Sequence, residues 1–128
     1  MLERLKSEQP VVYQTLKNGL EKDRLSHALL LTGPKGTPRL ETALLLAQSL
    51  FCEHSDPFGC GQCAVCERTF RNEYSDLIVL DGSKKSIKKD EILQLQEKFS
   101  KTAVEKSGHR VYILNAADNA TVEALNSL

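Results

Sequence analysis

The stretch "LLLTGPKGTPRLE", residues 29–41, decides the fold that this sequence predicts. An apolar run at 29–31 leads into a turn of Gly, Pro, Lys and Gly, and a long apolar segment follows at 38–51. This order of strand, loop and helix is typical of a phosphate-binding loop. It indicates an α/β fold in which buried parallel strands alternate with helices.

The loop departs from the phosphate-binding pattern where the helix should begin. Gly33 and Gly36 are kept, but Pro38 takes the place of the last glycine. Arg39 replaces the lysine, and Leu40 replaces the Ser or Thr that holds Mg²⁺. Proline has no N–H for a phosphate, a guanidinium is broader than an ammonium, and leucine offers no oxygen. We therefore expect no bound nucleotide at this degenerate loop.

A plain strand-to-helix turn is the competing interpretation of these residues, because glycine and proline mark many turns. Proline is favoured in the first turn of a helix, and Thr37 before it predicts an N-cap. The turn is therefore expected to form with or without a ligand.

Hydrophobic periodicity predicts the remaining elements. Helices are expected at 10 to about 19, 38–51, 86–100 and 118–128, and strands at 28–32, 76–81 and 109–115. The chain has 128 residues, of which 41% are apolar, which suits a single domain with its own core. The pattern continues to the last residue without a helix stop signal, so the sequence is expected to be a piece of a longer protein.

The third predicted strand offers a second test of nucleotide chemistry. Nucleotide hydrolases with such loops end this strand in an Asp that holds Mg²⁺ and a Glu that orients water. Here the strand is followed by Asn115 and Ala116, so both carboxylates are missing. Asp118 nearby is interpreted as a carboxylate favoured by a helix N-terminus. No nucleophile and base pair is recognisable either, so we expect no catalytic residues and no enzyme activity.

Four cysteines lie close together in the sequence and form the strongest motif. Cys52, Cys60, Cys63 and Cys66 are separated by seven, two and two residues. In a chain without an export signal this spacing predicts a closed structural zinc site within an insertion at 52–66. An iron–sulfur cluster is the alternative, and His54 is an alternative ligand for one of the cysteines.

Charge and hydropathy restrict the possible partners. Seventeen basic and seventeen acidic residues cancel, so long-range attraction to nucleic acid or membrane is not expected. One basic cluster, of Lys84, Lys85, Lys88 and Lys89, precedes the third predicted helix. It is either a solvated turn or a contact for DNA phosphates. No apolar run is long enough for a membrane span, so we expect no membrane partner.

The sequence resembles the N-terminal part of the delta-prime subunits of bacterial DNA polymerase III clamp loaders, a family of AAA+ proteins. The resemblance rests on "RLSHALLLTGPKG", on the four-cysteine insertion after the following helix, on "YSDLIVLDG" and on "RVYILNAADNATVEALNSL". It covers essentially all 128 residues. The cysteine insertion is shared with the ATPase subunits of such loaders, whereas loss of both nucleotide motifs is typical of delta-prime.

The resemblance implies a P-loop NTPase-like AAA+ domain with three layers and a parallel sheet, incomplete because a later strand lies between its first and third strands. It also implies a non-catalytic subunit in a ring with the gamma/tau ATPase subunits and the delta subunit. Such a ring opens a sliding clamp and places it on primed DNA, in the bacterial cytoplasm with the replisome. An ATP-binding ATPase subunit of a clamp loader is the alternative, and a zinc module that binds nucleic acid by itself is a second one.

Overall fold

The computed structural model describes residues 2–83, 85–100, 105 and 107–126. Two compact units make up the chain, Met1–Arg71 and Asn72–Leu128, and each is described by itself. Among the described residues, no helix combines the length and the apolar character needed to cross a membrane.

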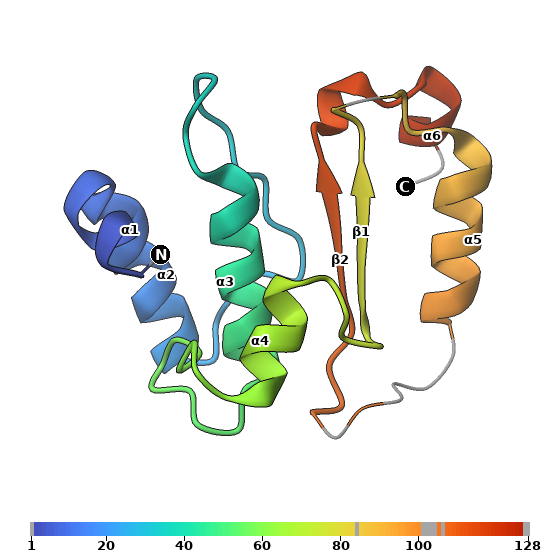
Figure 1. Ribbon diagram of the computed structural model, residues 1–128. Coiled ribbons are helices and arrows are strands. Elements are labelled where there is room, and N and C mark those ends of the chain that lie inside the picture. Colours follow the sequence, from blue (N-terminus) through green and yellow to red (C-terminus); the bar gives the residue numbers. More distant parts are fainter. Residues whose placement is uncertain (1, 84, 101–104, 106, 127–128) are drawn as a thin grey trace. The chain divides into compact units, whose positions relative to one another are not determined.

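The first unit is helical. Its helices are α1 (Leu2–Glu8), α2 (Pro10–Glu21), α3 (Arg39–Phe51) and α4 (Ala64–Phe70). Pro10 begins α2 because proline tolerates the first helical position, where no N–H bond is needed. Figure 1 shows α4 against the end of α3 that leads into it. The predicted helices at 10–19 and 38–51 are confirmed, whereas α1 and α4 were not predicted.

A small core joins these helices. Leu5 of α1, Leu16 of α2 and Leu45 and Leu46 of α3 are buried together with Phe58 from the following loop. The ring of Phe58 stacks on Tyr13, with 5.6 Å between the ring centroids. Apolar contacts between α1, α2 and α3 therefore hold the first unit together.

The predicted strand at 28–32 is not formed, and this prediction is wrong. Within the described residues the segment belongs to no ladder, and Leu30 is 82% exposed. An extended segment becomes a strand only when a neighbouring strand takes up its N–H and C=O groups. The apolar run predicted a buried strand, but nothing described here pairs with it.

The second unit contains a parallel β–α–β arrangement. Strand β1 (Leu77–Asp81) pairs in parallel with β2 (Val111–Asn115), from Leu77 opposite Val111 to Asp81 opposite Asn115. Helix α5 (Lys89–Phe99) lies beside the two strands (Figure 1). Parallel neighbours need such a crossover, so the predicted strands at 76–81 and 109–115 and the α/β class are confirmed.

The end of the second unit differs in detail from the prediction. Helix α5 begins at Lys89, later than expected, and the Glu91 carboxylate accepts the Lys88 N–H at 3.3 Å. The helix predicted at 118–128 is divided into a 3₁₀ turn, η1 (Ala117–Asn119), and α6 (Val122–Asn126), and residues 127–128 lie outside the described range. Ile87, Ile92 and Ala124 form the buried centre, against Leu80 and Leu114 of the strands.

Candidate metal centre and degenerate nucleotide loop

The four cysteines converge on one point. Their Sγ atoms all lie within 4.8 Å of one another, and those of Cys52 and Cys63 are 3.8 Å apart. A tetrahedral zinc ion with Zn–S bonds of about 2.3 Å places its sulfurs about 3.8 Å from one another. The donor set therefore fits a single tetrahedral metal ion.

Secondary structure positions three of these ligands. Cys52 is the C-cap of α3, Cys63 is the N-cap of α4, and Cys66 lies in the first turn of α4. Cys60 lies in the connecting turn, where Gly61 has a φ of +73°. Because L-residues rarely adopt such a φ, glycine at this position lets the chain turn from Cys60 back to Cys63.

Backbone N–H groups point at the sulfurs. The amides of His54, Cys63 and Cys66 donate to the Sγ atoms of Cys52, Cys60 and Cys63, at 3.3, 3.3 and 3.4 Å. Donors of this kind stabilise thiolates and are common around metal-bound cysteines. The side chain of His54 is exposed and lies outside the cysteine group, so His54 contributes its backbone N–H to the site.

The thiols differ in acidity. Backbone N–H donors from Gln62 and Cys63 lower the pKa of exposed Cys60 to about 6. Burial raises the pKa of the Cys66 thiol well above its ordinary value, and burial also raises the pKa of Cys63. Because a metal binds thiolates, loading the site at neutral pH releases protons from the buried thiols.

Buried polar side chains of α3 fasten the cysteine insertion. Gln48 Nε2 donates to the Cys66 carbonyl at 2.9 Å. Ser49 Oγ accepts the Gly59 N–H at 2.9 Å and donates to Leu45 O at 2.8 Å. Neither residue was predicted, because a polar pair inside an otherwise apolar segment is the only signal that the sequence gives for them.

The loop before α3, which was predicted to be a degenerate phosphate-binding loop, is built from local hydrogen bonds. The Thr37 N–H and Oγ1 both bond to Pro34 O, at 3.2 and 2.7 Å, and the Arg39 N–H donates to Thr37 O at 2.9 Å. Gly36 provides the turn with a φ of +96°. Pro38 is the N-cap of α3, so the prediction of Thr37 as N-cap is wrong: its hydroxyl is bonded to Pro34 instead.

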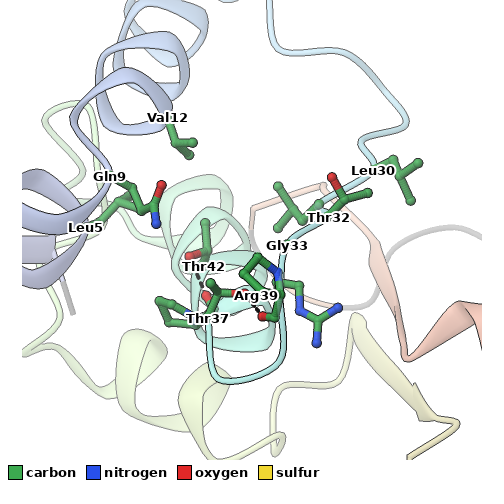
Figure 2. A pocket seen from close by; sticks show the side chains of 12 residues that line it. Leu5, Gln9, Val12, Leu30, Thr32, Gly33, Thr37, Arg39 and Thr42 are labelled. Carbon is green, nitrogen blue, oxygen red and sulfur yellow. Dashed lines mark hydrogen bonds between the residues drawn. The ribbon is translucent and has the colours of Figure 1, made fainter.

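A cavity of about 310 Å³ lies beside this loop in the first unit. Figure 2 shows Leu5, Gln9 and Val12 on one side of it and Leu30 and Thr32 on the other, with the loop between them. Arg39 and the predicted residues Gly33 and Pro38 also line the cavity, whereas exposed Gly36 and half-buried Leu40 do not.

The second motif forms a closed turn at the ends of β1 and β2. Asn115 Nδ2 donates to Asp81 Oδ1 at 3.0 Å, and Ala116 has a left-handed φ of +54°. Gly82 N–H donates to Asn115 O at 2.8 Å, and Asn119 Nδ2 donates to Gly82 O at 2.5 Å. The contributions of Asp81 and Gly82 were not predicted, because they depend on the register of the two strands.

The predicted basic cluster is only partly described. Lys85, Lys88 and Lys89 are exposed around the start of α5, and Lys84 lies outside the described residues. The three described lysines therefore present positive charge to solvent at that end of the helix.

The second unit is a parallel β–α–β arrangement, and in the first unit a turn leads into the largely buried helix α3, which is followed by four clustered cysteines. These features define an α/β protein with four cysteines that could hold a metal ion. The sequence model of the family described as DNA polymerase III, delta subunit, matches residues 8–128. The chain belongs to this family, whose members are AAA+ proteins of clamp loaders. The predicted resemblance to delta-prime subunits is confirmed.

Curated relatives support the assignment. The DNA polymerase III subunit delta' of Bacillus subtilis (strain 168) is 47% identical over 120 residues, which cover 94% of this chain and 36% of the relative. The subunit tau of the same organism is 32% identical over 122 residues, 91% of this chain and 21% of the relative. Protein STICHEL-like 1 of Arabidopsis thaliana is 37% identical over 82 residues, 61% of this chain and 7% of the relative. The chain thus spans about a third or less of the length of these relatives.

Proposed function

We propose that residues 1–128 are the AAA+ N-terminal domain of a clamp-loader subunit of the delta-prime kind, which does not hydrolyse ATP. In this role the protein helps to load a sliding clamp onto primed DNA. Its family and its similarity to subunits named delta' and tau support the proposal. The observation that carries the non-catalytic part is the hydrogen bonding of the degenerate loop.

In a phosphate-binding loop, consecutive backbone N–H groups point at the phosphates. Here the Thr37 and Arg39 N–H groups already donate to carbonyls within the loop, and Pro38 between them has no N–H. Three successive positions therefore offer no free donor to a phosphate. Leu40 in turn lacks the hydroxyl that would ligate Mg²⁺.

The second motif supports the same conclusion. Asn115 stands where a hydrolase holds Mg²⁺ with an aspartate, and its amide is hydrogen-bonded to Asp81. Ala116, in the place of the glutamate, has no group that orients a water molecule. These residues close a turn instead of facing a metal and a nucleophile.

The alternative, an ATP-binding ATPase subunit, is favoured by the similarity to subunit tau. Equilibrium ATP binding with and without Mg²⁺ distinguishes the two. The natural protein should not bind ATP at millimolar concentration, whereas a variant with Pro38→Gly, Arg39→Lys and Leu40→Thr should gain affinity. Arg39→Lys alone is the matched control and should gain none, because Pro38 still lacks its N–H. Tight Mg²⁺-dependent binding by the natural protein would refute the proposal.

We propose that the 52–66 insertion holds one structural zinc ion through Cys52, Cys60, Cys63 and Cys66. The sulfur separations support a single ion, because an iron–sulfur cubane spreads its thiolates around four iron atoms. Four protein ligands leave no position for a catalytic water, so the zinc stabilises the insertion. Metal analysis should find about one zinc per chain. A colourless protein without iron agrees with this assignment, and the absorption of an iron–sulfur cluster contradicts it.

The partners follow from the same assignment. The proposal places the protein in a ring with gamma/tau ATPase subunits and a delta subunit, so that it acts on the sliding clamp indirectly and on primed DNA through the assembly. The location is the bacterial cytoplasm, with the replisome. Co-purification of a stoichiometric complex with these subunits would support this placement, and a protein that stays monomeric in their presence would contradict it.

The lysine cluster of Lys84, Lys85, Lys88 and Lys89 is the part of the chain that we propose for DNA contact. Lys85, Lys88 and Lys89 are exposed, as a phosphate contact requires. The affinity of the assembled loader for DNA should fall as the salt concentration rises. The double substitution Lys88→Ala and Lys89→Ala should make this salt dependence weaker, reducing the steepness of log affinity against log salt by roughly 0.9 per lost phosphate contact. Lys22→Ala, at the exposed C-cap of α2, is the matched control. If the salt dependence of DNA affinity is unchanged in the double variant, the lysine cluster is a solvated turn and the proposed DNA contact is wrong.

A further inference from the structure

The four cysteine ligands are unequally protected from solvent. The Cys66 side chain is 0% exposed and that of Cys52 is 7% exposed. Cys63 is partly exposed, and Cys60 is exposed. The candidate metal centre therefore has a buried pair of ligands, Cys52 and Cys66, and a more accessible pair, Cys60 in the turn and Cys63 at the N-cap of α4.

The turn is closed on one side of Cys60 and open on the other. A Cβ atom added at Gly59 would lie 3.0 Å from the Gln48 backbone, so that side is packed against α3. A Cβ added at Gly61 would meet no heavy atom within 4 Å. Because Cys60 itself is exposed and the space beside Gly61 is open, a small molecule can reach this part of the turn.

We propose that Cys60 is a site of oxidative modification for peroxide-class oxidants, and that its oxidation releases the metal. This inference rests on the proposed zinc site. The Cys60 thiolate takes an oxygen atom from hydrogen peroxide, which becomes hydroxide, and forms a sulfenic acid. The Cys63 thiolate then attacks this sulfur, displaces hydroxide and leaves a Cys60–Cys63 disulfide. Two thiolates lose two electrons, and one peroxide with two protons gives two waters.

Cys63 is the partner that the geometry favours. All four sulfurs lie within 4.8 Å of one another, but Cys63 is partly exposed whereas Cys52 and Cys66 are buried. The Cys63 N–H also donates to Cys60 Sγ at 3.3 Å, which fixes the turn between these two residues. Loss of two of the four ligands leaves Cys52 and Cys66 alone, too few to hold a zinc ion tightly. The zinc ion leaves without changing its own oxidation state.

The surrounding helices allow the modification to be reversed. The bond from Gln48 to the Cys66 carbonyl and the bonds of Ser49 to Leu45 and Gly59 involve no sulfur, so they do not depend on the metal. Helices α3 and α4 therefore stay joined while the turn is oxidised. A thiol reductant with added zinc should restore the original site.

The test uses the zinc-loaded protein, whose metal content is measured first. A protein without bound metal would refute the zinc proposal itself, before any oxidant is added. Hydrogen peroxide is then added at and below one equivalent per chain, zinc release is followed with a chromogenic chelator, and peptide mapping locates the oxidised cysteines. We expect release of zinc together with a Cys60–Cys63 disulfide, and recovery of the site with dithiothreitol and zinc.

Two variants sharpen the test. Cys60→His keeps a nitrogen ligand that peroxide does not oxidise in this way, so zinc release should slow by about tenfold or more. Cys63→His removes the second thiol, so the Cys60 sulfenic acid should accumulate and be trapped by dimedone. As the control, His27→Ala changes an exposed histidine outside the cysteine insertion and should behave like the natural protein. Mapping of the first oxidation to Cys52 or Cys66, or an unchanged release rate in Cys60→His, would overturn the inference.

Discussion

Substitution of Gly82 tests whether the second motif serves as a packed turn. In Gly82→Ala the new Cβ would lie 2.6 Å from the Ala116 carbonyl oxygen and 3.2 Å from the Asn115 carbonyl oxygen. Both neighbours are backbone atoms and do not rotate away as a side chain would. The φ of Gly82 is outside the left-handed region, so the effect is steric and not conformational.

The expected loss of stability follows from two contributions. Overpacking against rigid atoms costs about 1–3 kcal/mol. Moving the Asn115 carbonyl also weakens its hydrogen bond from the Gly82 N–H, now 2.8 Å long, which adds about 1 kcal/mol. The free energy of unfolding should therefore fall by about 2–4 kcal/mol, which corresponds to a decrease of about 1–2 M in the urea midpoint.

Gly108→Ala is the matched control in the same unit. Its Cβ would meet no heavy atom within 4 Å, but its φ of +74° strains any L-residue. The expected cost is about 1–2 kcal/mol, from backbone conformation alone. Urea unfolding followed by circular dichroism compares the two variants. If Gly82→Ala is as stable as the natural protein, or loses less stability than Gly108→Ala, the close packing deduced for this turn is wrong.

Three further predictions concern other parts of the chain. Ala116→Gly should raise the free energy of unfolding by about 0.5–1 kcal/mol in the same assay, because it relieves a left-handed alanine with φ +54°; a loss of stability would contradict this. Leu5→Ala should lower it by about 2–5 kcal/mol, because Leu5 is 1% exposed in the core of the first unit, and a loss below 1 kcal/mol would contradict that packing. In the metal-free protein, thiols react as thiolates, which form above their pKa: alkylation of Cys60 by iodoacetamide should level off by about pH 7, whereas that of buried Cys66 should still rise at pH 9. Mass spectrometry of the alkylated peptides checks the order.

Local patterns in the sequence predicted the elements whose partners lie nearby. The apolar residues of α3 and the periodicity of α5 identify buried faces. Strands β1 and β2 are separated in the chain by α5, which is the helical connection that two parallel neighbouring strands require. The apolar run at 28–32 carries the same signal, yet it forms no strand because strand formation requires a neighbour that periodicity does not reveal. Helix α1 was missed because its single buried leucine, Leu5, gives no recognisable pattern.

The candidate site was predicted where it depends on residue type and spacing. Cysteines separated by two residues predicted the convergence of sulfurs, which the structure confirms. The acidity of Cys60 and the support from Gln48 depend on N–H directions and burial, which spacing alone does not encode. Likewise, the pairing of Asn115 with Asp81 follows from the strand register and not from either residue by itself.

The mostly exposed segment at 28–32 is also a position at which the chain of the first unit can be cut into two pieces. A protease that cuts this accessible, extended stretch would separate α1 and α2 from α3, yet the two pieces share one apolar core. This core contains residues of both pieces. Leu5 and Leu16 belong to the first piece, and they pack with Leu45, Leu46 and Phe58 of the second. Separately produced halves should therefore reassemble without a peptide bond between them, so this linker is a natural position at which to split the protein into a complementation pair.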